Sequence, residues 1–215
     1  MRTERFVLRE IRVSGLDRIA ESEILGRIRP PSDTRLFDLD IAAIQEVLLA
    51  DPWIREVTLR KEYPDMLSVF IVERHPAAVL VNPPFSALAD EAGAIMARWA
   101  IGDAEAESWS SLPVIRGVDI SGIARRENGA LERFAAARTA LREAGPREGE
   151  GLVVDVSRPS DIQVLRDGRR FHVGTAPFEA KWRRFRSVQA EIAPNSPPSG
   201  GAVVDLRFPN QVIIR

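Results

Sequence analysis

The segment 51–76 constrains the fold of this chain more than any other part of it. Pro52 ends a helical pattern, because proline cannot donate the helical N–H bond. Apolar residues then recur in two strand-like runs, at 54–61 and 66–73, joined by a short proline-containing turn. Pro76 marks a sharp exit, since the residue before a proline is pushed toward extended geometry. The segment predicts a small module typical of protein binding rather than catalysis.

The residues before this segment complete the module with one strand and two helices. Apolar residues at even spacing predict a strand at 6–13, which a Ser-Gly turn signal ends. Ser22 can cap a short helix, and Asp40 opens a second helix at 41–50. The order β-α-α-β-β over residues 1–75 therefore predicts a first, separate domain.

Residues 76–215 predict a larger second domain, an antiparallel sheet for the most part, with helices packed on it. Asp167-Gly168 is a strong signal for a two-residue hairpin. A long amphipathic helix begins at Pro177, and a loop rich in Pro, Ser and Gly follows at 194–201. Short strand patterns occur at 78–81, 86–89, 152–156 and 162–165, a turn is indicated at 90–93 before residues 94–98, and 112–115 is a brief apolar run. The chain as a whole is predicted to be an α+β protein.

Composition narrows the possible function classes. The chain has 215 residues and a net charge of −1, which gives no electrostatic field strong enough to favour nucleic-acid binding. It has no cysteine, so zinc–thiolate sites and thiol nucleophiles are excluded. His75 and His172 lie far apart, with no Asp or Glu at ligand spacing, so no metal site is expected. We find no nucleophile elbow, zinc-binding helix or phosphate-cradling loop, and no window with the roughly 18 consecutive apolar residues of a membrane span. No catalytic residue and no cofactor are predicted.

Two features could contact a partner or simply belong to the fold. The basic residues of the amphipathic helix fit a solvated helix face better than a nucleic-acid or phospholipid contact, because the apolar stripe already explains where the helix lies. They are Lys181, Arg183, Arg184 and Arg186. Trp53 lies at a helix-to-strand junction, where a tryptophan can plug the core or act as a surface anchor. The core position is the favoured interpretation.

The C-terminal segment is the stronger candidate for a binding site. Residues 202–215 predict a terminal strand with a kink at Pro209, since proline is tolerated at an edge or a bulge. A last strand at a sheet edge offers unpaired backbone groups that a partner strand can join. Arg207 then reaches outward toward an acidic partner, whereas the alternating residues that can pack inward are Val204, Leu206 and Phe208. An ordinary buried strand explains the same alternation, and the sequence alone leaves both interpretations open.

Several short motifs, in this order and spacing, extend over nearly the whole chain. They are Ile11-Arg12-Val13-Ser14-Gly15-Leu16, Leu36-Phe37-Asp38-Leu39-Asp40, Asp51-Pro52-Trp53-Ile54, Glu73-Arg74-His75-Pro76, Leu88-Ala89-Asp90-Glu91-Ala92-Gly93, Leu112-Pro113-Val114-Ile115 and Val203-Val204-Asp205-Leu206-Arg207-Phe208. Together they resemble the bacterial cell-division family FtsQ, also called DivIB. No single motif is decisive, and the combination carries the resemblance.

The resemblance implies a polypeptide-transport-associated (POTRA) domain at 1–75 and a β domain at 76–215. It further implies a noncatalytic scaffold of the division septum, a single-pass protein on the periplasmic side of the inner membrane that binds the division proteins FtsB and FtsL. The chain begins with polar residues and lacks the family's cytoplasmic tail and membrane helix. We therefore expect it to be the excised periplasmic part.

The resemblance also implies the contact residues. A partner strand is expected to pair along about Val204 to Ile214, and Arg158 matches an arginine that can grip an acidic partner residue. The expected partner-binding residues are Arg158, Val204, Leu206, Arg207, Phe208, Asn210, Val212 and Ile214. A contact of the POTRA domain through Trp53 is an analogy only.

Two alternatives belong to other classes of protein. A POTRA-bearing component of outer-membrane protein assembly or two-partner secretion is the first, although such proteins usually carry tandem POTRA units or a membrane barrel. An envelope hydrolase is the second, and it requires a clustered acid and base with a perturbed carboxylate.

Overall fold

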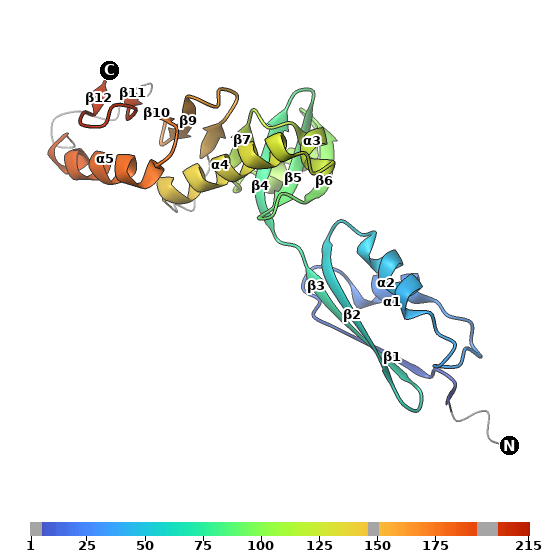
Figure 1. The fold of residues 1–215 in the computed structure, drawn as a ribbon. Helices are drawn as coiled ribbons and strands as arrows, with labels where there is room; N and C mark the ends of the chain where they lie inside the picture. The colour runs from blue at the N-terminus through green and yellow to red at the C-terminus, as the bar shows by residue number, and fades with distance from the viewer. Residues whose placement is uncertain (1–5, 146–150, 193–201) are drawn as a thin grey trace. The chain divides into compact units, whose positions relative to one another are not determined.

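The computed structural model describes residues 6–145, 151–192 and 202–215, so the loop expected at 194–201 lies outside the described residues. The chain divides into two compact units, Met1–His75 and Pro76–Arg215. Each contains a sheet and helices, as Figure 1 shows. The α+β class predicted from the sequence is confirmed.

The first unit is a three-stranded sheet with two helices against one face (Figure 1). Its elements are β1 (Glu10–Ser14), α1 (Glu21–Ile28), α2 (Ile41–Leu49), β2 (Ile54–Glu62) and β3 (Met66–Glu73). The sheet order is β1-β3-β2, with β1 parallel and β2 antiparallel to β3. The predicted order of elements is therefore correct. The first strand starts later than predicted, since Val7 forms only an isolated bridge with Arg35.

The two helices of this unit begin in different ways. Asp40 caps α2 as predicted, because its carboxylate accepts the N–H groups of Ala42 and Ala43, both at 3.0 Å. The expected cap of α1 is wrong. The N-cap position is Ala20, two residues before Ser22, and no side chain caps the helix.

The core of the first unit includes one buried carboxylate. Glu73 is 4% exposed and accepts the N–H groups of Asp17, Arg18 and Ile19 at 2.9 to 3.0 Å. Burial opposes its charged form, yet the three backbone bonds hold the pKa of Glu73 below its usual value. The contact fastens the loop after β1 to the end of β3. The apolar core comprises Ile24, Ile28, Leu39, Leu48, Ile54, Val57, Leu67, Val69 and Ile71.

The second unit is a nine-stranded mixed sheet with the order β12-β11-β10-β9-β8-β7-β4-β5-β6. The strands are β4 (Pro76–Asn82), β5 (Phe85–Asp90), β6 (Ile95–Ala100), β7 (Val114–Arg116), β8 (Val153–Asp155), β9 (Ile162–Arg166), β10 (Arg169–Gly174), β11 (Val203–Asp205) and β12 (Ile213–Ile214). The helices are α3 (Ile120–Ala124), α4 (Asn128–Ala144), α5 (Phe178–Ile192) and the 3₁₀ turn η2 (Ala104–Trp109). α3, α4 and α5 follow one another along the sheet (Figure 1).

A few local signals position these elements. Asp167 and Gly168 have φ angles of 51° and 71°, which are the positive values that a type I′ hairpin turn requires, so the predicted hairpin is confirmed. The predicted stripe of α5 is buried through Phe178, Trp182 and Phe185. The ring of Phe171 lies 5.0 Å from the rings of both Trp182 and Phe185, which fastens α5 to β10.

The single terminal strand expected from the sequence is wrong. The chain forms two short strands, because it turns at Phe208 to Asn210 and returns antiparallel, with Ile214 opposite Val204. Pro209 therefore lies in a turn and does not kink a strand. As a result β11 is an interior strand, paired with both β10 and β12, and β12 is the last strand of the order.

Candidate partner-binding site

Among the residues that the structure describes, β12 is the last strand at this end of the sheet, and no strand pairs with its outer side. The N–H and C=O groups of Arg215 exchange hydrogen bonds with those of Val203, at 2.9 and 3.0 Å. In an antiparallel pair the next residue points its N–H and C=O the other way. Ile214 therefore directs its N–H and C=O groups away from β11. Ile214 is 43% exposed.

Two of the expected contact residues belong to the core. Val204 and Leu206 are 1% and 0% exposed, so their side chains pack inward as the alternation predicted. The backbone of Val204 faces β12 on one side and β10 on the other, and Leu206 donates its N–H to His172 O at 2.9 Å. The side chains of these two residues are part of the core under the candidate site. β12 lies beside Val204, whereas the N–H and C=O groups of Leu206 are bonded to His172 O and to Arg184.

The turn between β11 and β12 presents the exposed candidates. Phe208 is 45% exposed, Asn210 is exposed, and Val212 is half-buried against the core. Phe208 does not continue the inward alternation, because the strand has already ended at Asp205. An exposed aromatic ring beside an open strand edge is the kind of side chain that anchors an interface.

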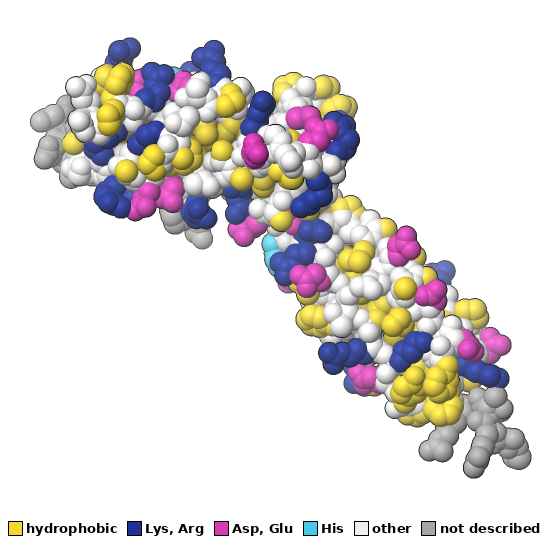
Figure 2. Space-filling view, viewed as in Figure 1, with side chains coloured by type: hydrophobic (Ala, Val, Ile, Leu, Met, Phe, Trp, Pro, Cys, Tyr) yellow, Lys and Arg dark blue, Asp and Glu magenta, His cyan; other side chains and the backbone are white. Residues whose placement is uncertain are grey.

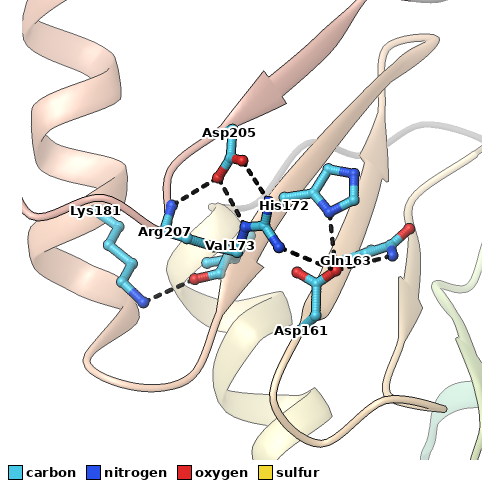
Figure 3. Close-up of polar contacts among 7 residues, drawn as sticks. All are labelled: Asp161, Gln163, His172, Val173, Lys181, Asp205 and Arg207. Carbon is cyan, nitrogen blue, oxygen red and sulfur yellow. Dashed lines mark hydrogen bonds and ion pairs between the residues drawn. The ribbon is translucent and has the colours of Figure 1, made fainter. Parts of the chain in front are cut away.

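A charged cluster borders this turn (Figure 3). Arg207 forms a two-pronged ion pair with Asp205, at 3.0 and 2.6 Å. Its guanidinium also lies 3.7 Å from Asp161, whose carboxylate is 3.0 Å from His172 Nδ1. Gln163 contributes a longer contact to Asp161 at 3.4 Å. The cluster joins the start of β9 to β10 and β11.

The ion pair shifts the pKa values of both partners. The hydrogen bonds from Arg207 hold the pKa of Asp205 below its usual value, against the effect of burial. The same pair raises the pKa of Arg207. The arginine expected to reach outward for a partner is thus already neutralised within the chain, although its side chain is still 44% exposed.

Arg158 lies in the turn that leads to this cluster. Its carbonyl accepts the N–H of Asp161 at 2.9 Å, which closes the turn. Asp161 belongs to the charged cluster, so Arg158 precedes the cluster by three residues. Arg158 is exposed and makes no ion pair with any residue that the structure describes. Of the two arginines expected to bind a partner, Arg158 is the one without an ion pair to any described residue.

The basic face of α5 is not simply solvated, which corrects the favoured interpretation for two of its four residues. Lys181 donates to Val173 O at 2.8 Å (Figure 3), and Arg184 donates to Leu206 O at 3.1 Å. Burial, followed by the charge of Arg184, lowers the pKa of Lys181. The side chain of Arg183, by contrast, is 72% exposed and, among the described residues, pairs with Glu179 alone. Figure 2 shows the Lys and Arg side chains over this part of the second unit.

Trp53 is neither fully buried in the core nor fully exposed at the surface. It is half-buried in the first unit, and its backbone N–H donates to Asp51 Oδ1 at 2.8 Å. The Arg18 guanidinium lies 4.2 Å from the centroid of its ring. A partner contact through Trp53 stays a prediction.

The described residues hold no group of three or more His, Cys, Asp or Glu side chains that could bind a metal ion. None of the helices within residues 6–145, 151–192 and 202–215 has the length and apolar character that crossing a bilayer requires.

Comparison with known proteins finds one matching family model and several named relatives. The family model described as "POTRA domain, FtsQ-type" matches residues 6–74. A protein of Myxococcus fulvus named "Cell division protein FtsQ" is 28% identical over 192 residues, which cover 87% of this chain and 66% of that relative. A relative of the same name from Geobacter sp. strain M21 is 25% identical, covering 100% of this chain and 77% of its own length. Another, from Novosphingobium aromaticivorans, is 35% identical over 88 residues, which cover 41% of this chain and 28% of its own length.

The chain thus spans just under two thirds of the length of the Myxococcus relative and a smaller share of the Novosphingobium one. The match to the family model ends one residue before His75, the last residue of the first unit. The resemblance noted from the motifs is confirmed. Residues 6–74 are a POTRA domain of the FtsQ type, and the chain is similar over most of its length to relatives named "Cell division protein FtsQ".

Proposed function

We propose that this chain is a noncatalytic scaffold of the cell-division machinery that captures an extended segment of a partner on the outer edge of β12. The observation that carries the proposal is the geometry of Ile214, whose N–H and C=O point away from β11 at the end of the sheet. A partner strand that pairs there extends the sheet by one strand.

The surroundings of the edge suit a charged and aromatic partner contact. Phe208 offers an exposed ring, and Arg158, on the turn before β9, offers a positive charge that no residue within the described ranges neutralises. An acidic residue of the partner can pair with Arg158, and its apolar residues can cover Phe208 and Ile214. A stable complex should bury on the order of 1,000 Å² or more in total.

The relatives are cell-division proteins by name, which supports a role at the division septum. The family resemblance further supports FtsB and FtsL as the partners, and the periplasmic side of the inner membrane as the place. The POTRA domain is then available to other division proteins, with Trp53 as one candidate contact.

The test is the affinity of this chain for the soluble segments of FtsB and FtsL from the same organism. Phe208→Glu should weaken binding by about 1 to 4 kcal/mol, as the loss of an interface anchor does. Phe85→Glu is the matched control, since Phe85 is a comparably exposed ring, 38% exposed, in the strand next to the opposite edge. Equal effects of the two substitutions move the site away from β12, and no binding of either segment to the wild type rejects these partners.

A further inference from the structure

The turn that creates the β12 edge is held by side chains as much as by backbone. Arg207 N–H donates to the carboxylate of Asp205 at 3.0 Å, and Pro209 has no N–H to give. β12 itself contains only Ile213 and Ile214. A strand this short has little stability of its own, because a two-stranded ribbon is marginal even at greater length.

The carbonyl groups of this turn are bound by one side chain of α5. Arg184 donates from Nη2 to Leu206 O at 3.1 Å and from Nη1 to Pro209 O. The two carbonyls lie on either side of Phe208, so one guanidinium spans the turn at the point where the exposed ring leaves it. Guanidinium suits this task, because its donors are fixed in a plane and can reach two acceptors at once.

A second contact fixes α5 against the same part of the sheet. Lys181, one helical turn before Arg184, donates to the carbonyls of Val173 and Thr175 at the end of β10. α5 is therefore fastened to β10 by Lys181 and to the turn after β11 by Arg184. α5 therefore links the turn after β11 to the end of β10.

We infer that Arg184 is a positioning residue for the β12 edge: by bridging Leu206 O and Pro209 O, it sets the turn that brings Ile213 and Ile214 back onto β11. Its effect on partner binding rests on the proposed function, whereas its effect on β12 does not. Arg184 itself contacts no partner in this scheme.

The test compares Arg184→Met with Arg183→Met. Methionine keeps an apolar stem in both variants, but the side chain of Arg183 is 72% exposed and, within the described part of the chain, pairs with Glu179 alone, so its loss leaves the turn unchanged. The readout is amide hydrogen exchange measured by NMR at Arg215, whose N–H bonds to Val203 O across β11 and β12. The amide of Val156, which bonds to Arg116 O at 2.9 Å in the middle of the sheet, is the internal reference.

Arg184→Met should speed exchange at Arg215 by about 10-fold or more and leave Val156 unchanged, while Arg183→Met changes neither amide. Arg184→Lys should fall between the two, since one ammonium group cannot reproduce the fork. Equal exchange at Arg215 in the two methionine variants overturns the inference. A uniform increase at both amides also overturns it, because it shows general destabilisation and not a local role.

The consequence for binding is measured separately. If the FtsB or FtsL segment binds the wild type, Arg184→Met should weaken binding by about 10-fold, and Arg183→Met should leave it unchanged. If neither segment binds the wild type, the proposed partners fail, while the exchange at Arg215 still decides the role of Arg184.

Discussion

The two edges of the nine-stranded sheet differ in a way that their lengths do not suggest. β6, at one end, has six residues, and β12, at the other, has two. A longer open edge offers more backbone groups to another strand, so length alone favours β6 as the place where a partner pairs. The contacts around the two strands favour the opposite conclusion.

β6 is protected. Ile101 N–H bonds inward to Pro84 O at 3.0 Å, so the alternation turns the N–H of Ala100 outward, where the carboxylate of Asp103 accepts it at 3.0 Å. Arg98 places a charge on the same strand and stacks 4.0 Å over the ring of Phe85. Capped donors and charged side chains are the usual ways in which proteins prevent edge-to-edge pairing. If a partner pairs with β12 as proposed, protection of the backbone matters more than strand length for which edge binds.

The largest expected effect comes from removing the outward donor of β12. Ile214→Pro deletes an N–H that points away from β11, so it breaks no bond between β11 and β12, and Ile213 is already in the extended geometry that precedes a proline. We expect the affinity for the partner segment to fall at least 100-fold, about 3 kcal/mol. Isothermal titration calorimetry measures this loss.

Ile214→Ala is the control, because it keeps the backbone donor and removes only the exposed side chain. It should cost clearly less affinity than the proline variant. If alanine and proline weaken binding equally, the partner recognises the side chain of Ile214, and pairing along the β12 backbone is rejected.

A double substitution should give β6 an edge that can pair with another strand, as proposed for β12. The double change Asp103→Ala with Arg98→Val frees the N–H of Ala100 and replaces the charge with a β-branched residue that favours strands. We expect a loss of about 1 kcal/mol of stability from the broken hydrogen bond. We also expect an average mass in sedimentation equilibrium that rises with concentration more steeply than for the wild type. An unchanged mass across that range shows that something other than Asp103 and Arg98 protects β6.

The sequence predicted the local features of these edges better than the long-range ones. The hairpin at Asp167-Gly168 and the cap at Asp40 depend on a residue and its immediate neighbours, and both are confirmed. The inward packing of Val204 and Leu206 was also predictable, since alternation requires no knowledge of the neighbouring strand. The class of fold follows from such local patterns added together.

The order of the strands was not predictable in this way. Pro209-Asn210 is compatible with a kink or with a turn, and the choice depends on whether residues 213–214 can pair with 204–205, which is a property of the folded sheet. The partners of Arg184 and Asp161 were likewise missed, because Arg184 lies 25 residues from Pro209 in the sequence and Asp161 lies farther still from Arg207. One signal was available. At about 100° per residue, Lys181 and Arg184 lie on one flank of the apolar stripe and Arg183 and Arg186 on the other.

The smallest expected effect concerns the charge pair beside the open edge. The folded-state pKa of Asp205 is lowered below its ordinary value of 3.8, so its stabilising contribution is complete above that value and is lost as the pH falls through the folded pKa. We expect less than about 1 kcal/mol, because Arg207 is 44% exposed and water screens the pair. Asp205→Asn should therefore lower stability slightly at pH 7 and flatten its decline in acid, as followed by urea unfolding between pH 7 and pH 2.5.

The same acid titration separates the two edges. Protonation of Asp205 should reduce the exchange protection of Arg215, which bonds to Val203 two residues before Asp205 in β11, before that of Ile101, which bonds to Pro84 O at the other end of the sheet. Arg207→Met should remove the same part of the acid effect, and the double variant should show no further change, because the two side chains act as one pair. If Arg215 and Ile101 lose protection together, the cluster around Asp205 stabilises the sheet as a whole, and its proximity to the binding edge has no separate consequence.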